Sequence, residues 1–544
     1  MLHGEKSPHS GAVPVARRPV FAGIAGLFAL LVSMSIATAQ TAPGGADVPP
    51  PRFSAVPVPE EQIDRALAGL DTLVADVLER TGIPGLAVSV VRDGKTAFAR
   101  GFGQRRVGEA APVDADTVFL LASLSKPVGA TVIASQVAHG LVDWDTPVAS
   151  LLPWFALSDD WVTRHVTIGD LYAHRSGLPD HAGDDLEDLG YDRMEILKRL
   201  ALLPLHPFRA HYAYTNFGLT AAAEAVAVAA GTDWAELSRQ ALYAPLGMAA
   251  TSSLHADYSA RANRASSHIL KDGRYVVADL RQPDAQSPAG GVSSSANDMA
   301  KWMTLILAEG SFGGREVIAR KALLPAVTAQ VISAPSTTMD ARAGAYGFGF
   351  GVGTQPSGRV TLSHSGAFAL GAGTSVSMIP SLGIGIVVLT NAAPVGAAEA
   401  VSQTFADQVQ FGRQTRDWLA AFQPRMASLT APVGSLVGQA RPQTPQPHRD
   451  AAAYIGVYKN PYFGDAKVVE RAGGLALVVG PNQQAEPLAP WSGDTFTYAP
   501  FNENAAPGTL SRVTFKRFER DEAQEMTVEY FEQSGFGAFN RQTL

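Results

Sequence analysis

The sequence predicts an α+β fold: an antiparallel sheet flanked by helices carries an all-helical subdomain and is followed by a small all-β domain. Three observations lead to this prediction. Apolar runs flank the turn residues 92–95, as in a β-hairpin. Helical periodicity dominates from Thr167 to Leu246. Residues 451–544 break into short alternating runs separated by Gly, Pro and Asn, which is typical of a small antiparallel barrel or sandwich.

The composition excludes several classes of function. The 544 residues are 46% hydrophobic and 17% charged, so the chain can bury large cores in more than one domain. It has no cysteine, which excludes disulfides, thiolate metal sites and a cysteine nucleophile. The net charge is −7 and no basic tract follows the first forty residues, so we expect no nucleic-acid partner. The sequence lacks a His-Glu-x-x-His motif, a phosphate loop and a dinucleotide fingerprint, so we expect neither a metal nor an organic cofactor.

The N-terminal segment is typical of an export signal. A nonpolar run from Phe21 to Ala39 ends in Ala-Thr-Ala, an A-x-A cleavage pattern, and three cations precede it: Lys6, Arg17 and Arg18. The alternative is an uncleaved anchor helix, because the run is almost long enough to span a bilayer. The small residues and the A-x-A end favour cleavage. We therefore expect a signal peptide over 1–39, no stable membrane anchor, and a periplasmic or secreted protein.

The rest of the chain divides into a lead-in, two domains and a linker. Residues 40–59 are rich in proline and predict an extended lead-in, and residues 60–421 are predicted as the first domain. This domain begins with a helical period over 60–82. Its strands are predicted at 86–91, 96–101, 359–362, 375–379 and 383–390. Residues 422–450 are rich in Pro, Gln and Ser and predict a linker, and 451–544 are the second domain, with runs at 466–470, 475–479, 495–499, 511–518 and 525–531.

A candidate nucleophile lies where an apolar run meets a helix, in Leu121-Ala122-Ser123-Leu124-Ser125-Lys126-Pro127. Lys126 follows Ser123 by three residues, a spacing that shares one helix face. A serine becomes a nucleophile when a neighbour takes its proton, and a buried lysine of lowered pKa can do so. The helix start also offers free N–H groups for an oxyanion. The alternative is that Ser123 merely caps the helix.

Two further motifs carry polar chemistry. Tyr214 and Asn216 lie two residues apart, so an extended backbone would aim both side chains the same way, as suits a proton-shuttling tyrosine beside an amide that orients a substrate. The alternative for Tyr214 is a half-buried core aromatic residue. His364 and Gly366 lie in a Ser-His-Ser-Gly-Ala segment between two predicted strands. The glycine lets a substrate backbone approach, and Ala367 supplies an N–H for an oxyanion.

Three other segments are interpreted as structural. His174, in the turn His-Arg-Ser-Gly-Leu-Pro, is expected to hydrogen-bond the turn, although a catalytic role is the alternative. The acidic run from Asp180 to Asp188 lacks the spacing of a calcium loop and predicts a solvated surface. The turn Pro288-Ala289-Gly290-Gly291 and the helix after it are interpreted as packing elements.

Together and in this order, Ser-x-x-Lys, Tyr-x-Asn and His-x-Gly resemble the serine β-lactamase and penicillin-binding-protein superfamily. The resemblance is greatest to the class C β-lactamase-related group, and it implies the β-lactamase/transpeptidase-like version of the predicted fold. By position it implies that Ser123 is the nucleophile, Lys126 its proton acceptor and Tyr214 a second acid/base. It further implies that Asn216 orients the scissile bond and that the N–H groups of Ser123 and Ala367 form the oxyanion hole.

One departure from the family bears on the substrate. His364 stands where β-lactamases usually carry the lysine of Lys-Thr-Gly, and a neutral imidazole is a weaker partner for a β-lactam carboxylate. The resemblance therefore implies an acyl-enzyme peptidase acting on short or linearised peptides with D- or unusual residues. A carboxylesterase, a β-lactamase and a non-catalytic penicillin-binding-protein-like sensor are the alternatives. The second domain resembles a lipocalin-like domain, which would cap the active site, build a homo-oligomer or only stabilise the chain.

Overall fold

The computed structural model describes residues 54–542. The predicted signal peptide and most of the proline-rich lead-in lie outside the described residues, and residues 54–59 form neither helix nor strand. Within 54–542, no helix is both long enough and apolar enough to cross a membrane.

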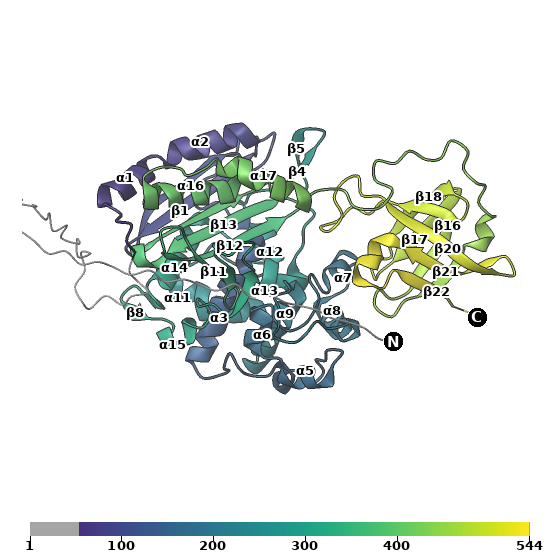
Figure 1. Ribbon diagram of the computed structural model, residues 1–544, viewed down its shortest axis with the longest axis horizontal. Helices are drawn as coiled ribbons and strands as arrows, with labels where there is room; N and C mark the ends of the chain where they lie inside the picture. Colours follow the sequence, from purple (N-terminus) through teal and green to yellow (C-terminus); the bar gives the residue numbers. More distant parts are fainter. Residues whose placement is uncertain (1–53, 543–544) are drawn as a thin grey trace, which may run out of the picture. The chain divides into compact units, whose positions relative to one another are not determined.

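The central element of the first domain is an eight-stranded sheet with the order β2-β1-β14-β13-β12-β11-β10-β9 (Figure 1). Every neighbouring pair is antiparallel, which confirms the predicted sheet and its N-terminal hairpin. The strands are β1 (Gly85–Arg92), β2 (Lys95–Gly103), β9 (Val331–Ala334), β10 (Gly344–Tyr346), β11 (Gly351–Thr354), β12 (Val360–Phe368), β13 (Ala372–Ile379) and β14 (Ile384–Thr390).

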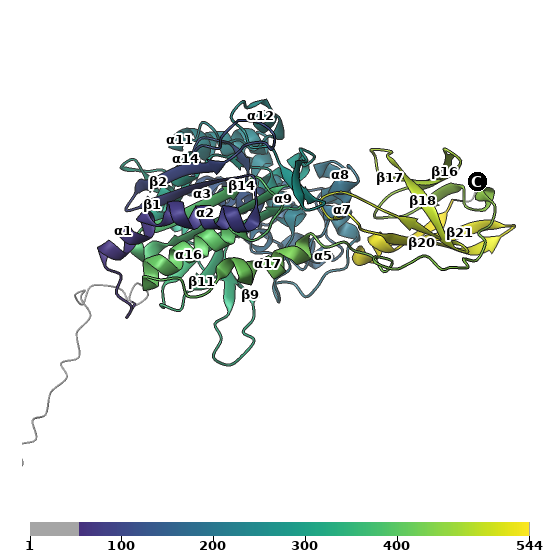
Figure 2. The same ribbon diagram turned by 90° about the horizontal axis from the view of Figure 1, so that it is seen from above.

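Helices cover both faces of this sheet because its central strands are apolar on both sides. Leu86, Val88 and Val90 of β1 pack against α1, α2 and α16, whereas Ala87 and Val91 face the core on the α14 side. Figure 2 looks down on the layer of α1, α2, α16 and α17. The bounds of these helices are α1 (Glu60–Ala68), α2 (Leu70–Thr81), α14 (Ala296–Leu307), α15 (Arg320–Leu323), α16 (Ala397–Phe411) and α17 (Trp418–Leu429).

Two helix boundaries of the first domain differ from the prediction. The helical period over 60–82 is two helices separated at Gly69, a residue of low helix propensity. Residues 422–429, predicted as the start of the linker, belong to α17. This helix continues because it is docked: the Trp418 indole donates to Asp407 Oδ2 at 2.7 Å, and Phe422 packs on Gly396 at the start of α16.

The predicted helical subdomain is confirmed, and α3 (Ser125–Ala138) joins it to the sheet domain. Its other helices are α4 (Val148–Leu151), α5 (Asp160–His165), α6 (Ile168–Tyr172), α7 (Asp184–Asp188), α8 (Arg193–Arg199), α9 (Asn216–Ala229), α10 (Trp234–Ser238), α11 (Ala244–Leu246), α12 (His255–Ala260) and α13 (Ser287–Gly290). Three short strand pairs complete the domain: β3 (Phe119–Leu120) with β6 (Ser293–Ser294), β4 (His268–Lys271) with β5 (Arg274–Val277), and β7 (Ser311–Phe312) with β8 (Arg315–Glu316).

The second domain is a closed antiparallel barrel of eight strands, drawn in yellow-green and yellow in Figure 1. The strands are β15 (Gly456–Lys459), β16 (Ala466–Arg471), β17 (Gly474–Val479), β18 (Ala485–Ser492), β19 (Thr495–Tyr498), β20 (Ser511–Glu519), β21 (Glu522–Val528) and β22 (Ala538–Arg541). The sequence pattern missed β15, β18 and β22. It also carried the fifth run to Phe531, whereas β21 ends at Val528 and a 3₁₀ turn follows. The barrel contacts the helical subdomain, where the Tyr191 hydroxyl donates to Phe463 O at 2.7 Å.

Candidate active site

Ser123 lies in a 3₁₀ turn (Ala122–Leu124) directly before α3. The preceding residue, Ala122, has a φ of 48°, a left-handed conformation that an alanine rarely adopts. The N-cap of α3 is Leu124 and not Ser123, so Ser123 does not cap this helix. Instead Ser125 anchors the turn, because its hydroxyl accepts from Val292 N–H at 2.9 Å. In this position the half-buried Ser123 hydroxyl contacts Lys126 and Tyr214.

Lys126 is wholly buried at the start of α3. Its Nζ lies 3.1 Å from Ser123 Oγ, 2.6 Å from Asn216 Oδ1 and 3.0 Å from Ala289 O. Burial lowers the pKa of Lys126 to about 7, against a smaller raising effect of the Asp184 carboxylate. Near neutral pH a large fraction of Lys126 is therefore an uncharged amine that can accept a proton.

Tyr214 contacts the same hydroxyl. Its Oη donates to Ser123 Oγ at 2.7 Å, and its ring lies under Lys126 Nζ at 4.4 Å. Burial raises the pKa of Tyr214 well above its ordinary value, so it stays a phenol. Thr215 is extended and Asn216 is the first residue of α9, which turns both Tyr214 and Asn216 towards Ser123 and Lys126. The sequence prediction that these two side chains point the same way agrees with this geometry.

His364, Gly366 and Ala367 lie on β12 and not between two strands, which corrects the expected boundary. The register of β12 with β11 ends at Ser363, whereas its register with β13 continues to Phe368. A Cβ on Gly366 would lie 2.5 Å from Leu121 O and 3.0 Å from Ser123 N, so only glycine lets β12 pass this close to the nucleophile turn. Ala367 follows at the same place, and its part in an oxyanion hole stays a prediction.

The His364 imidazole is held in one neutral form. Its Nδ1 lies 2.7 Å from Ser365 O, so Nδ1 carries the proton, and its Nε2 accepts from the Tyr346 hydroxyl at 2.7 Å. Burial and the nearby Lys126 lower the pKa of His364 to about 3. The residue that replaces the family's lysine therefore carries no positive charge at neutral pH.

His174 has the structural role that the sequence predicts. It is buried with a φ of 55°, and its Nδ1 accepts from Thr215 N–H at 3.1 Å, which links the turn to the Tyr214 segment. Burial lowers the pKa of His174 well below its ordinary value, so the imidazole is neutral. Asp170 holds this turn, because it accepts from both Arg175 and Arg209.

The acidic segment is exposed at Asp180, as the sequence predicts, but its residues from Asp184 to Asp188 are not a solvated surface. Asp184 is 6% exposed and belongs to the site, because its Oδ2 accepts from Asn216 Nδ2 at 2.8 Å. The next carboxylates face the barrel: Asp185 accepts from Ser534, and Asp188 accepts from Asn504. Burial raises the pKa of Asp185 to about 6 and that of Asp188 to about 8. The segment has the charge pattern of an exposed loop, but the barrel covers it.

Sequence reasoning missed three contributors to the site. The charge pattern predicts a surface position for Asp184, and no sequence motif includes Tyr346. Neither residue lies at a recognisable spacing from Ser123. Ala289 lies in a turn interpreted as packing, yet its carbonyl accepts from Lys126. The backbone of the Pro-Ala-Gly-Gly turn comes close to α3 at Gly129, where a Cβ would lie 3.2 Å from Pro288 O.

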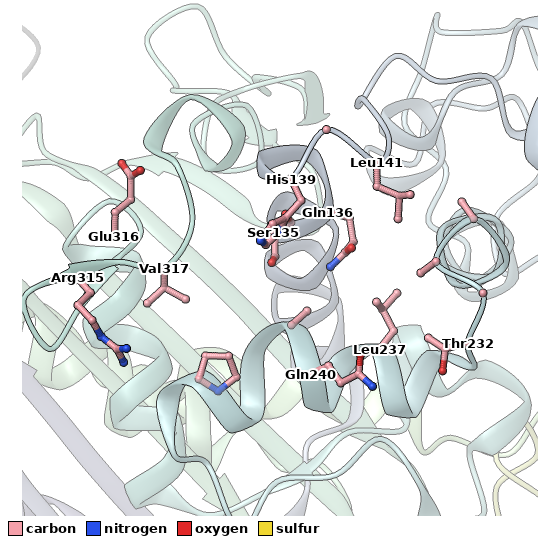
Figure 3. A pocket seen from close by; sticks show the side chains of 16 residues that line it. Ser135, Gln136, His139, Leu141, Thr232, Leu237, Gln240, Arg315, Glu316 and Val317 are labelled. Atoms are coloured by element: carbon pink, nitrogen blue, oxygen red, sulfur yellow. The ribbon is translucent and has the colours of Figure 1, made fainter.

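A separate hollow opens at the other end of α3 (Figure 3). It has a volume of about 1110 Å³ and lies between the C-terminal end of α3, the end of α9 and the β7–β8 hairpin, with Gln136, His139, Gln240 and Arg315 among its lining residues. Its lining, taken over the part of the chain that the structure describes, does not include Ser123, Lys126 or Tyr214. It is therefore not the space in which Ser123 would react.

Two family models match the chain. A model described as "Beta-lactamase" matches residues 70–410, which hold all seven predicted site residues. A model described as "Domain of unknown function (DUF3471)" matches residues 440–538, the barrel. The resemblance of the barrel to a lipocalin-like domain stays a prediction.

Three known proteins illustrate what the chain is similar to. Unguisins hydrolase ungD' of Aspergillus campestris is 29% identical over 59% of this chain, which spans 60% of that relative's length. The D-alanyl-D-alanine-carboxypeptidase/endopeptidase AmpH of Escherichia coli K12 is 23% identical over 62% of this chain and 88% of its own. The octameric penicillin-binding protein homologue from Pyrococcus abyssi covers 87% of this chain and 100% of its own, with a TM-score of 0.57 at 17% identity, and so shares the fold.

Proposed function

The chain belongs to the beta-lactamase family, and on that premise we propose that this serine hydrolase is a peptidase that forms an acyl-enzyme on Ser123. One observation carries the proposal: Ser123 Oγ accepts from the Tyr214 phenol at 2.7 Å and lies 3.1 Å from the buried amine of Lys126. A hydroxyl that accepts from a phenol has its own proton free for the amine. This arrangement prepares Ser123 for attack on a carbonyl carbon.

The first half-reaction moves one proton and forms one bond. Lys126 takes the Ser123 proton while Oγ attacks the carbonyl, and the N–H groups of Ser123 and Ala367 hold the oxyanion. When the carbon–nitrogen bond breaks, Tyr214 gives its proton to the leaving amine and recovers one from Lys126. Water then attacks the acyl carbon and gives one proton to Lys126 and Tyr214. The bond between the acyl carbon and Ser123 Oγ breaks, the acid product leaves, and the same two residues return the proton to Oγ.

Peptide substrates are favoured over esters because the site holds a proton donor, Tyr214, for the leaving amine. An amine leaves an acyl group only after it is protonated, and Tyr214, a phenol with a raised pKa, can supply that proton. An ester releases an alkoxide with less need of an acid, so a carboxylesterase is the second candidate. One relative, AmpH of Escherichia coli K12, is a D-alanyl-D-alanine-carboxypeptidase/endopeptidase, which supports the peptidase. We propose short or linearised peptides with D- or unusual residues as substrates of a protein exported by its 1–39 leader.

The proposal is tested by a hydrolysis panel on the chain lacking residues 1–39. The panel contains short L- and D-peptides, p-nitrophenyl acyl esters and nitrocefin, with Ser123→Ala as the blank. We expect peptide turnover that is absent from the blank. Ester turnover alone would favour the carboxylesterase, and fast nitrocefin turnover the β-lactamase. No turnover together with no labelling of Ser123 by a serine-directed probe would favour the non-catalytic sensor.

Replacing His364 by lysine is expected to add recognition of a substrate carboxylate. The neutral imidazole offers no charge, whereas an ammonium at this place supplies a charge-assisted hydrogen bond. Such a bond is worth about 1.5–3 kcal/mol, or about ten- to a hundredfold in kcat/KM. The measurement is the ratio of kcat/KM for a peptide with a free C-terminal carboxylate to that for its amide. His448→Lys, at an exposed position before the barrel, adds the same charge elsewhere. An unchanged ratio in His364→Lys would contradict the prediction.

The oligomeric state is a further part of the proposal. The penicillin-binding protein homologue from Pyrococcus abyssi, which covers 87% of this chain, is octameric, and this supports a homo-oligomer here. Light scattering on the purified chain tests it.

A further inference from the structure

We propose that Asp184 is a positioning residue of the reaction: through the Asn216 amide it turns the lone pair of Lys126 towards Ser123. This inference rests on the proposed function, because it concerns the same nucleophile and base. Asp184 belongs to none of the motifs that carry the family resemblance, and it lies outside the Ser-x-x-Lys and Tyr-x-Asn segments in sequence.

Asp184 is fixed in place from several sides. It is the first residue of α7, and its Oδ2 accepts from Asn216 Nδ2 and from His181 Nδ1, both at 2.8 Å. The preceding Gly183 has a φ of 93°, and a Cβ there would clash with Ile196. The Gly183 N–H also donates to the Tyr462 hydroxyl of the barrel at 3.1 Å. The carboxylate therefore has one position relative to Asn216.

This carboxylate decides which way the Asn216 amide faces. A carboxylate only accepts hydrogen bonds, so Asn216 must turn its NH₂ group towards Asp184. The amide oxygen then faces Lys126, where it lies 2.6 Å from Nζ. Without Asp184, the Asn216 amide could exchange the positions of its oxygen and its NH₂ group.

The orientation of the amide decides where the lysine lone pair points. An uncharged lysine has two N–H bonds and one lone pair. Asn216 Oδ1 and Ala289 O accept the two N–H bonds, so the lone pair is left for the Ser123 hydroxyl at 3.1 Å. A turned amide would present its NH₂ group to Nζ and take up the lone pair itself. Lys126 would then be buried and uncharged, but unable to accept the Ser123 proton.

The charge of Asp184 has a second, separable effect. It raises the pKa of Lys126, which burial lowers, so losing the charge moves the pKa further down. A base works when it is unprotonated, so activity falls as the pH drops through this pKa, and a lower pKa shifts the acidic limb to lower pH. Other titratable groups face the pair: His174, Tyr214 and His364 surround Lys126, while His181, Asp185, Glu187 and Tyr462 surround Asp184.

Two variants separate orientation from charge. Asp184→Ala removes the acceptor, and we expect kcat to fall about 10- to 100-fold, with a smaller change in KM. Asp184→Asn keeps an acceptor oxygen for Asn216 but loses the charge. We expect Asp184→Asn to keep most of the wild-type kcat at its pH optimum. The acidic limb of its pH profile should lie about one pH unit lower than in the wild type. The control is Asp185→Asn, the neighbouring carboxylate, which bonds Ser534 of the barrel and not Asn216.

The readout is the pH profile of two rates: hydrolysis of a substrate from the panel, and covalent labelling of Ser123 by a fluorophosphonate probe. Labelling reports the activated hydroxyl without any assumption about the substrate. The proposal is supported if Asp184→Ala loses kcat, while Asp184→Asn keeps most of kcat and shows an acidic limb at lower pH. Wild-type rates in Asp184→Ala, or equal losses in both variants without a shifted limb, would overturn it. Labelling without peptide turnover would refute the peptidase alone, and no labelling of the wild type would refute both.

Discussion

Replacing Lys126 by methionine is expected to lower kcat/KM for a peptide substrate by about 10⁴-fold, because it removes the general base and keeps the volume. Of the groups around Ser123 Oγ, the buried amine is the one whose pKa, about 7, suits proton transfer at neutral pH. The wild-type profile of kcat/KM should accordingly rise with pH through an acidic limb near pH 7, since the ammonium form cannot accept the proton. In Lys126→Met this limb should be absent.

The control for Lys126→Met is a test that the variant still folds. Methionine leaves Asn216 Oδ1 and Ala289 O without their donor, but it also removes a buried cation that burial penalises. Far-UV circular dichroism and the thermal midpoint should show a folded chain. A folded variant that keeps more than about a tenth of the wild-type kcat/KM would contradict the role of Lys126 as base.

Replacing Gly366 by alanine is the second change with a large expected effect. The added Cβ would lie 2.3 Å from Thr374 Oγ1 and 2.5 Å from Leu121 O, so the nucleophile turn or β12 must move. A displacement of about 1 Å at a reacting group costs about a hundredfold in rate. We therefore expect kcat to fall about 10²-fold while Lys126 stays buried and its acidic limb is unchanged. Steady-state kinetics across the pH range measures both.

Gly353→Ala on the neighbouring strand β11 is the matched control. The same change there meets only Thr361 Oγ1 at 3.2 Å, and the position is remote from the nucleophile turn. We expect a change in kcat of less than about threefold, in line with an ordinary surface substitution. Similar losses in both glycine variants would mean that Gly366 matters to the sheet and not to the placement of Ser123.

The features that the sequence alone determined are local in the chain. The hairpin at 92–95 depends on a turn signature between two apolar runs, and Ser123 and Lys126 depend on a spacing within one helical turn. Tyr214 and Asn216 likewise share one short segment, as do His364, Gly366 and Ala367. Neighbours in sequence must be neighbours in space, which is why the amino-acid order is enough to group the members of each of these elements and motifs.

Only the tertiary structure decided which distant groups meet. Asp184 reaches Lys126 through Asn216, and Tyr346 of β10 reaches His364 of β12 across the intervening strand β11, although no spacing in the chain links them. Closure of the barrel likewise joins residues that are distant in the chain: Arg541 of the last strand, β22, donates to Ile455 O, next to the first barrel strand, β15. The protonation states depend on the fold too, because a side chain's pKa follows its burial and its neighbours. The sequence therefore indicates the candidate reacting residues, and packing sets the charge and the direction of each.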